Sequence, residues 1–391
     1  MKRIQCIMLA MLMILSLSAC GTSSTQGYIE PEKEDYSHVT PDMSIINPEQ
    51  VKDEDPPEIE ESDDNVNNIP ESENIDVDSL GKCDIVFIDC GQADSILIDS
   101  PDGAVLVDAG ESSKATEIIE VLEDRSIDTI DILIGTHAHA DHIGGMKTIV
   151  ENYNIDTIIM SPTGHSSKTY EKLLLAIKDK EKYIDIAEVG NVYELGSLKI
   201  EIVGPVKDYE DLNDSSVQVI ASYGYTDILL TGDAELEAEM ASIPYIRDVD
   251  IMKAGHHGSS TSNCASLMNV ADPEVFIISC GKDNDYGHPH VETKDMLEDR
   301  QIPYFRTDED GTVTVSTDGI TYTISTENGG VVNEYTTTEN SDSDNIVYVT
   351  ESGTKYHSSK DCSSLANSKS ILNIKLTEAI IKGYERCSKC H

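Results

Sequence analysis

The chain has 391 residues, more than one ordinary domain requires, and a formal net charge of −45 from 73 acidic and 28 basic residues. Its apolar content of 39% is low for a chain that is folded throughout. No internal apolar stretch reaches the roughly 20 residues of a further membrane span, which excludes a polytopic transporter or channel. The acidity argues against tight binding of a polyanion through a basic surface, but it is compatible with a divalent metal site.

The N-terminus has the features of a secretory signal, because Lys2 and Arg3 precede an apolar run over residues 4–17. The tetrapeptide Leu-Ser-Ala-Cys that ends at Cys20 looks like a bacterial lipobox, whose cysteine is diacylated and becomes the mature N-terminus. We therefore expect a signal peptide at residues 1–19 and a protein that is exported and lipid-anchored through Cys20 on the outer face of the bacterial cytoplasmic membrane. An ordinary signal peptide with a chance cysteine is the alternative.

Charge and composition divide the rest of the chain. Residues 21–80 contain 18 acidic and 2 basic residues and no sustained apolar period, so we expect residues 20–80 to form a disordered acidic linker. Residues 81–328 carry 17 basic and 47 acidic residues, whereas residues 344–391 carry 7 and 5. With the Ser-, Thr-, Asn- and Gly-rich stretch between them, this step predicts a central domain at 81–328, a linker at 329–343 and a small module at 344–391.

The central domain begins with short predicted strands. They cover residues 84–89, 94–99 and 104–107, and a helical stretch follows over 114–125. Residues 129–134 form a nearly continuous apolar run, which is typical of a strand buried on both faces. The segment Gly-Thr-His-Ala-His-Ala-Asp-His-Ile-Gly-Gly, residues 135–145, comes directly after this strand.

That segment predicts a metal centre. His137 and His139, two positions apart on an extended loop, can direct both imidazoles at one point, and Asp141 and His142 follow as the chain turns into a helix. Four ligand-type residues within six positions, at the C-terminal end of a strand, suit a transition-metal ion.

The His-x-His-x-Asp-His run resembles the signature of the metallo-β-lactamase superfamily. Leu229–Asp233 looks like the superfamily's Gly-Asp motif, and Asp250–Ser259 looks like a further His motif. A narrower resemblance, over roughly residues 83–325, is to the soluble domain of ComEC-type DNA-uptake proteins. It rests on the segments Ile88–Asp94, Leu106–Gly110, Asn213–Ser216, Gly255–Ser259, Tyr286–His290 and Phe305–Asp308. The resemblance implies an α/β fold, the αββα sandwich, with metals at one edge between the sheets.

The resemblance also implies two divalent ions, Zn or Mn, and a role for each candidate residue. The first ion would be held by His137, His139 and Asp233, and the second by Asp141, His142, Asp233 and a further His. We favour His257 as that ligand, with His256 and His288 as alternatives. A water between the ions becomes the nucleophile. Lys253, Ser259 and Asn213 are candidate donors to the developing oxyanion, and the residues expected to support the ligands or contact substrate are Asp108, Asp94, His288 and His290.

One ligand of the superfamily pattern has no obvious counterpart. His165 is the only His between His142 and Asp233, and its loop-like surroundings indicate a surface residue. In the ComEC-like group an Asn-containing segment takes this place, which implies Asn213 or Asp214 here. A site richer in oxygen ligands favours a harder ion such as Mn²⁺.

The implied substrate is a phosphodiester, either nucleic acid or a smaller molecule. The net charge of −30 in residues 81–328 opposes a long nucleic acid unless the acidity lies away from the site. A lactone or β-lactam hydrolase of the same fold is one alternative, and a non-catalytic surface binding protein is another. The sequence does not indicate the oligomeric state.

The C-terminal module contains a Cys₃His set. His357, Cys362, Cys387 and Cys390, with a Cys-x₂-Cys knuckle, have the spacing of a structural zinc site. The segment resembles the zinc-binding domain of Ada-type proteins, which implies a small α+β module stapled by one Zn. The expected export makes disulfides the rival interpretation, and Cys387-x₂-Cys390-His391 also matches c-type haem attachment.

Overall fold

The structure is a computed structural model that describes residues 45–47, 80–337 and 346–390, apart from 351–352, 367, 369 and 388. The expected signal peptide, Cys20 and most of the expected acidic linker lie outside the described residues. Within the described ranges, no helix combines the length and apolar character needed to cross a membrane.

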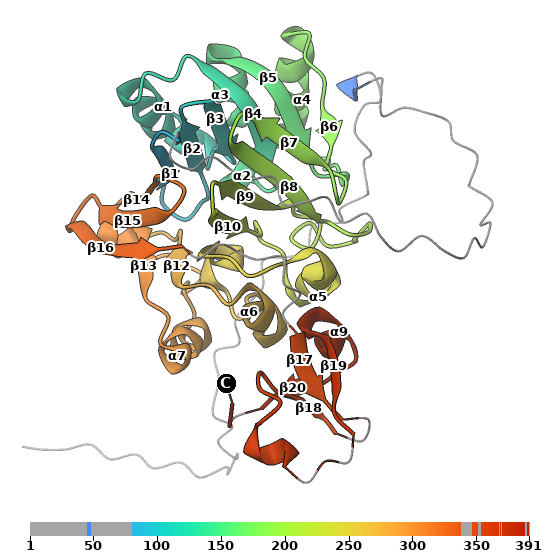
Figure 1. The fold of residues 1–391 in the computed structure, drawn as a ribbon. Helices are drawn as coiled ribbons and strands as arrows, with labels where there is room; N and C mark the ends of the chain where they lie inside the picture. The colour runs from blue at the N-terminus through green and yellow to red at the C-terminus, as the bar shows by residue number, and fades with distance from the viewer. Residues whose placement is uncertain are drawn as a thin grey trace, which may run out of the picture. The chain divides into compact units, whose positions relative to one another are not determined.

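Two sheets dominate the described residues (Figure 1). The first has nine strands in the order β16-β15-β14-β1-β2-β3-β4-β5-β6. Its strands are β1 Cys83–Phe87, β2 Ile96–Ser100, β3 Gly103–Val107, β4 Thr129–Gly135, β5 Asn154–Met160, β6 Asp185–Ile186, β14 Val313–Thr317, β15 Thr321–Thr326 and β16 Gly330–Thr336.

The second sheet has seven strands in the described ranges, in the order β13-β12-β11-β10-β9-β8-β7. Strands β10 to β13 run parallel to one another, whereas β7 to β10 form antiparallel pairs. The strands are β7 Val192–Leu195, β8 Leu198–Gly204, β9 Gln218–Tyr223, β10 Thr226–Leu230, β11 Ile251–Lys253, β12 Val275–Ile278 and β13 Tyr304–Arg306.

Helices cover the outer faces of both sheets (Figure 1). Alternate residues of β1 point to opposite sides, so that Ile85 packs between the sheets and Val86 packs under the helices of the first sheet. Both faces of each sheet are therefore apolar, and the expected αββα fold is confirmed. The helices of this domain are α1 Ala115–Asp124, α2 Ala140–Ile143, α3 Met146–Asn152, α4 Lys168–Asp179, α5 Leu236–Ser242, α6 Ala265–Ala271, α7 Val291–Arg300 and α8 Thr307–Asp310.

Two segments differ from the expected linkers. Residues 330–336 form β16, which pairs with β15 and extends the first sheet. Ile45 and Ile46, inside the expected disordered segment, are 2% and 8% exposed, and Ile46 pairs with Ile184 beside β6. They are an apolar pair in an acidic segment, and burial of their side chains offsets the entropy of ordering three residues.

The C-terminal module has two small two-stranded sheets within the described residues. Strands β17 and β19 are antiparallel, and β18 and β20 are parallel. The elements are β17 Ile346–Val349, β18 Lys355–Tyr356, β19 Leu372–Lys375, α9 Leu376–Ile381 and β20 Glu385–Arg386.

Candidate metal centre

The His-rich loop leaves the end of β4 and enters α2. Asp108, which follows β3 with a φ of 58°, fixes the start of this loop. Its carboxylate accepts hydrogen bonds from the backbone N–H of Thr136 (2.8 Å) and from the Thr136 hydroxyl (2.7 Å). The neighbouring parallel strands β3 and β4 thus present a carboxylate and the imidazoles at the same edge of the sheet.

The second sheet supplies the other half of the site. Asp233 follows the end of β10, and His256 and His257 follow the end of β11, its parallel neighbour. Gly232 has a φ of +56°, and a Cβ there would lie 3.0 Å from the Ser216 side chain. Glycine is therefore needed to bring Asp233 close to the His-rich loop.

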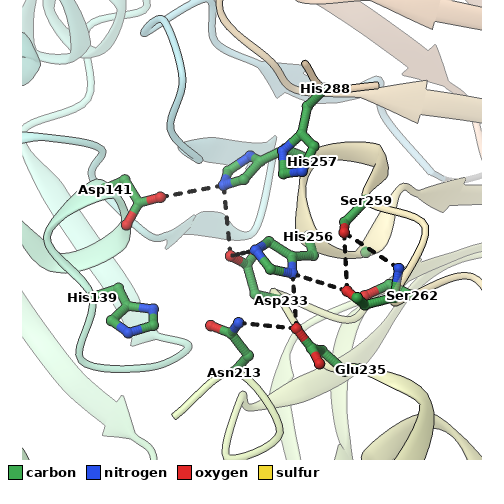
Figure 2. A network of polar contacts seen from close by, with 12 residues as sticks. His139, Asp141, Asn213, Asp233, Glu235, His256, His257, Ser259, Ser262 and His288 are labelled. Atoms are coloured by element: carbon green, nitrogen blue, oxygen red, sulfur yellow. Dashed lines mark hydrogen bonds and ion pairs between the residues drawn. The ribbon is translucent and has the colours of Figure 1, made fainter. Parts of the chain in front are cut away.

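Four of the expected ligands form one group. The ligand atoms of Asp141, His142, Asp233 and His257 lie within 4.8 Å of one another. Asp233 Oδ2 is 3.1 Å from His142 Nε2 and 3.6 Å from His257 Nε2, and Asp141 Oδ2 is 3.4 Å from His257 Nε2. Figure 2 shows the imidazole of His257 between the two carboxylates. This is the set expected for the second ion, and His257 is the further His that completes it.

The expected first position adjoins this group. His137 Nε2 lies 2.9 Å from His139 Nδ1 and 3.9 Å from Asp233 Oδ2, so the same carboxylate oxygen adjoins both positions. Asn213 offers a further oxygen: its Nδ2 donates to Glu235 (3.3 Å), while its buried Oδ1 has no hydrogen-bond partner among the described residues. In Figure 2 the oxygen side of Asn213 faces His139.

Asp214, the alternative to Asn213, has a different role. Its Oδ1 accepts hydrogen bonds from the backbone N–H groups of Glu235 (3.0 Å) and Ala238 (3.3 Å), at the start of α5. Of the two residues that the sequence left open, Asn213 therefore offers the free oxygen. His165 is not in any ligand-type group found among the described residues.

The residues present fit divalent cations. Asp233 Oδ1, His142 Nε2 and His257 Nε2 are buried and form no hydrogen bond among the described residues, although the two imidazole nitrogens lie near Asp233 Oδ2. Buried polar atoms without hydrogen bonds are costly, and a shared cation would satisfy all three. Carboxylate and imidazole donors in this number suit Zn²⁺ or Mn²⁺.

The pKa shifts of the buried site residues reflect the carboxylates gathered in the site. Although burial disfavours the imidazolium, the carboxylates of Asp233 and Asp94 raise the pKa of His257 to about 10. Burial likewise opposes ionisation of Asp233, but His142 and His257 hold its pKa well below the usual range. Burial lowers the pKa of His137 well below its usual value, which leaves this imidazole neutral and able to bind a cation.

Each buried ligand is supported from behind. Asp108 Oδ2 lies 2.7 Å from His142 Nδ1, and Ser279 O lies 3.1 Å from His257 Nδ1. Asp94 Oδ1 also approaches His257 Nδ1, at 3.4 Å. These contacts orient the rings so that Nε2 faces the other ligands. Asp108 and Asp94 thus lie behind the imidazoles of His142 and His257.

Lys253 and Ser259, the expected donors, are bonded to other residues inside the protein. Lys253 is fully buried, and its Nζ contacts Asp94 Oδ2 (2.5 Å) and Ala254 O (2.8 Å). Ser259 is 3% exposed and its hydroxyl pairs with that of Thr261 (2.9 Å). Both groups are thus bonded to neighbouring residues of the histidine loop and to Asp94, and their role as donors to an oxyanion stays a prediction.

His256 lies at the rim. Its Nδ1 is 3.2 Å from Glu235 Oε1, and its Nε2 is 3.8 Å from Asp233 Oδ2. His256 and His257 both have left-handed backbone conformations, with φ of 50° and 53°. Two consecutive non-glycine residues in this region cost conformational energy. Figure 2 shows the two imidazoles near Asp233 on different sides.

Three supporting residues were missed from the sequence. Gln92 contacts His288, Glu235 contacts His256, and Ser279 contacts His257 through its backbone oxygen. Gln92 lies within the segment Ile88–Asp94 and Glu235 lies two residues after Asp233, so their position in or beside a recognised motif is the available signal. Ser279 acts through a backbone atom, and its residue type therefore carries no information.

The module residues expected to bind zinc do come together. The ligand atoms of His357, Cys362, Cys387 and Cys390 lie within 4.8 Å of one another, and the cysteines among the described residues are all unpaired. The Cys362 and Cys387 sulfurs are 3.9 Å apart. That matches the about 3.8 Å expected for two sulfurs each about 2.3 Å from a tetrahedral zinc ion, rather than the about 2 Å of a disulfide. His391, part of the haem alternative, lies outside the described residues.

Comparison with known proteins decides the family. The model of the metallo-beta-lactamase superfamily matches residues 88–282. Residues 88–282 form a metallo-β-lactamase domain. The superfamily is one of metal-dependent hydrolases, and the resemblance inferred from the motifs is confirmed.

Relatives with curated descriptions extend the comparison. ComE operon protein 3 of Bacillus subtilis is 31% identical over 252 residues, 59% of this chain and 32% of that protein. Recombination protein 2 of Haemophilus influenzae is 29% identical over 218 residues, 54% of this chain and 26% of that protein. Exodeoxyribonuclease WalJ of Streptococcus pneumoniae is 26% identical over 199 residues, 48% of this chain and 72% of that protein. The matches span about a third or less of the first two relatives.

Proposed function

We propose that the protein is a metal-dependent phosphodiesterase that cleaves nucleic acid or a smaller phosphodiester. The observation that carries the proposal is the position of Asp233 Oδ2, which adjoins both the Asp141–His142–His257 group and the His137–His139 pair. A relative described as an exodeoxyribonuclease, with 72% of its length covered, supports phosphodiester hydrolysis over other chemistries of the fold.

Two divalent cations bound in such a site supply Lewis acidity and a water that ionises near neutral pH. The chain's own residues bind and orient. His137, His142, Asp233 and His257 are buried, whereas His139, Asp141 and His256 are partly exposed. A substrate therefore approaches across the three partly exposed residues, and the buried four stay fixed behind them.

The types of ligand in each position bear on which metal ion activates the site best. The second position has two imidazoles and two carboxylates, a set that suits zinc or manganese. In the first position, the oxygen of Asn213 takes the place of a third imidazole. We propose that this makes Mn²⁺ a better activator than Zn²⁺, because harder ions prefer oxygen ligands.

The charge of the domain favours a short substrate. Residues 81–328 carry a net charge of −30, which repels the many phosphates of a long duplex. One end of the site offers a stacking surface: the exposed ring of Tyr286 lies against His288 with an interplanar angle of 24°. Bases stack on such rings regardless of sequence, so an oligonucleotide can gain affinity there without a basic surface.

A substrate panel tests the proposal. The purified, Mn²⁺-loaded chain is offered a single-stranded oligodeoxynucleotide, bis(p-nitrophenyl) phosphate, nitrocefin and an acyl homoserine lactone. We expect hydrolysis of the two phosphodiesters only. Hydrolysis of nitrocefin or the lactone with both phosphodiesters intact would replace the proposal with the lactamase or lactonase alternative. Binding of metal without any hydrolysis would favour a non-catalytic binding protein.

We also propose that the protein is exported and anchored by a lipid on Cys20. The support is the sequence of residues 1–20. The predicted result of Cys20→Ser is loss of the protein from the membrane fraction, measured by fractionation and metabolic labelling with palmitate. Retention of the variant in the membrane without label would contradict the anchor.

A further inference from the structure

The segment of residues 281–290, called here the 281–290 loop, is tied to the metal-binding loops by side chains. The backbone N–H of Gly281 donates to Gln92 Oε1 (2.9 Å). Asn284 brackets His288, because its Oδ1 accepts from the His288 N–H (3.0 Å) and its Nδ2 donates to the His288 carbonyl (2.6 Å). His290 Nδ1 accepts from the Ser260 N–H (2.9 Å). These bonds hold the ring of His288 in one place.

The hydrogen bonds of Gln92 decide which nitrogen of His288 carries the proton. Gly281 N–H is a donor only, so the atom of Gln92 that faces it is the carbonyl oxygen. The other end of the amide, Nε2, is therefore the end that lies 3.3 Å from His288 Nδ1. An amide NH₂ has no acceptor, and Nδ1 must accept this bond. Neutral His288 consequently carries its hydrogen on Nε2.

The protonated nitrogen of His288, Nε2, is close to the candidate metal ligands and forms no hydrogen bond with a described residue. The ring centroid of His288 is 5.5 Å from that of His256 and 6.2 Å from that of His257, and Figure 2 shows the ring beside His257. Nε2 bears hydrogen in this tautomer and has no lone pair for a cation, so that a role for His288 as a metal ligand would require the other tautomer.

We propose that Gln92 is a positioning residue that fixes the Nε2–H tautomer of His288, and that this N–H donates a hydrogen bond to an oxygen of the bound phosphodiester. The proposal rests on the proposed phosphodiesterase function. A neutral donor held in place by the fold stabilises charge that develops on phosphate oxygens, and it does so without reorganisation during the reaction. His288 then contacts the substrate, whereas Gln92 acts only through His288.

The variant Gln92→Glu inverts the tautomer with almost no change in shape. The introduced carboxylate still accepts from Gly281 N–H, but its second oxygen is also an acceptor, so His288 must donate from Nδ1. In the neutral ring, Nε2 then becomes an acceptor facing the phosphate. We expect kcat for the oligodeoxynucleotide to fall about 10- to 100-fold, with KM and metal content changed by less than about twofold.

The tautomer of His288 can be measured directly by NMR, in an experiment that does not depend on enzyme activity. Two-bond proton–nitrogen correlation spectra of the full chain, labelled with ¹⁵N-histidine and loaded with Zn²⁺, distinguish Nε2–H from Nδ1–H rings, and His288→Phe identifies the His288 signals. We expect Nε2–H in the wild type and Nδ1–H in Gln92→Glu. An Nδ1–H ring in the wild type, or one tautomer in both proteins, would overturn the assignment to Gln92.

A double-variant cycle separates the tautomer from the added charge. We expect His288→Phe alone to lose as much activity as Gln92→Glu, and the pair to lose no more than either. An additional loss in the pair would show that the carboxylate acts by its charge, which contradicts the proposal. If the wild type cleaves no phosphodiester at all, the proposed function and the substrate contact fail together, whereas the spectra still decide the role of Gln92.

Discussion

Asp233→Asn is expected to reduce phosphodiester cleavage by about 1,000-fold or more, a loss typical of removing a principal charge-stabilising group. Its Oδ2 lies 3.1 Å from His142 Nε2 and 3.9 Å from His137 Nε2, so one atom serves both expected metal positions. Asparagine keeps the shape but removes the negative charge that holds the cations. Steady-state kinetics and metal analysis of the same samples measure the effect.

The matched control is Asp124→Asn, which removes a carboxylate from the exposed end of α1. It changes the net charge equally and leaves the site intact, so its activity is expected to stay within about twofold of the wild type. Undiminished cleavage by Asp233→Asn would show that the reaction occurs elsewhere in the chain.

Cys387→Ser is expected to remove one equivalent of zinc and to unfold the C-terminal module while the hydrolase site keeps its metal. Cys387 is 2% exposed and lies 3.9 Å from Cys362 in the Cys₃His group. A unit of 48 residues, 344–391, builds only a small apolar core of its own, and binding of a structural zinc ion contributes about 10 kcal/mol or more to such folds. Limited proteolysis of the module and zinc release by a colorimetric chelator measure the two effects.

Cys264→Ser is the control for that variant. The Cys264 sulfur accepts from the Leu267 N–H at the start of α6, and serine fills the same capping position. We expect its zinc content and proteolysis pattern to match those of the wild type. A wild-type module that binds no zinc and in which only one of the three cysteines reacts as a thiol under denaturing, non-reducing conditions would instead establish the disulfide alternative.

The candidate metal ligands could be predicted because ligand-type residues stand close together in short sequence motifs. The His-rich loop, the Gly-Asp motif and the Gly-His-His-Gly turn each follow a strand end, and strands of one sandwich bring such ends together. The choice of His257 over His256 could not be derived from spacing alone. It depends on left-handed backbone conformations at both residues, which turn one ring inward and leave the other at the rim.

Other features depend on partners distant in sequence. Lysine is a residue type that often serves as a catalytic donor. The Nζ of Lys253, however, contacts a buried carboxylate 159 positions away, that of Asp94. Gln92 is separated from His288 by 196 positions, and its role appears only when the 281–290 loop is in place. The sequence predicts a linker where β16 forms, because its Ser-, Thr-, Asn- and Gly-rich surroundings are typical of loops, whereas pairing with β15 decides its structure.

The most direct test of metal-dependent hydrolysis is a metal titration of the purified chain after chelation, with bound metal and cleavage of a labelled oligodeoxynucleotide followed in the same samples. We expect no cleavage before metal is added, and a rise that ends when the hydrolase domain holds two ions, with a higher plateau for Mn²⁺ than for Zn²⁺. Cleavage that survives chelation, or full occupancy of the site without cleavage of any phosphodiester, would contradict this account.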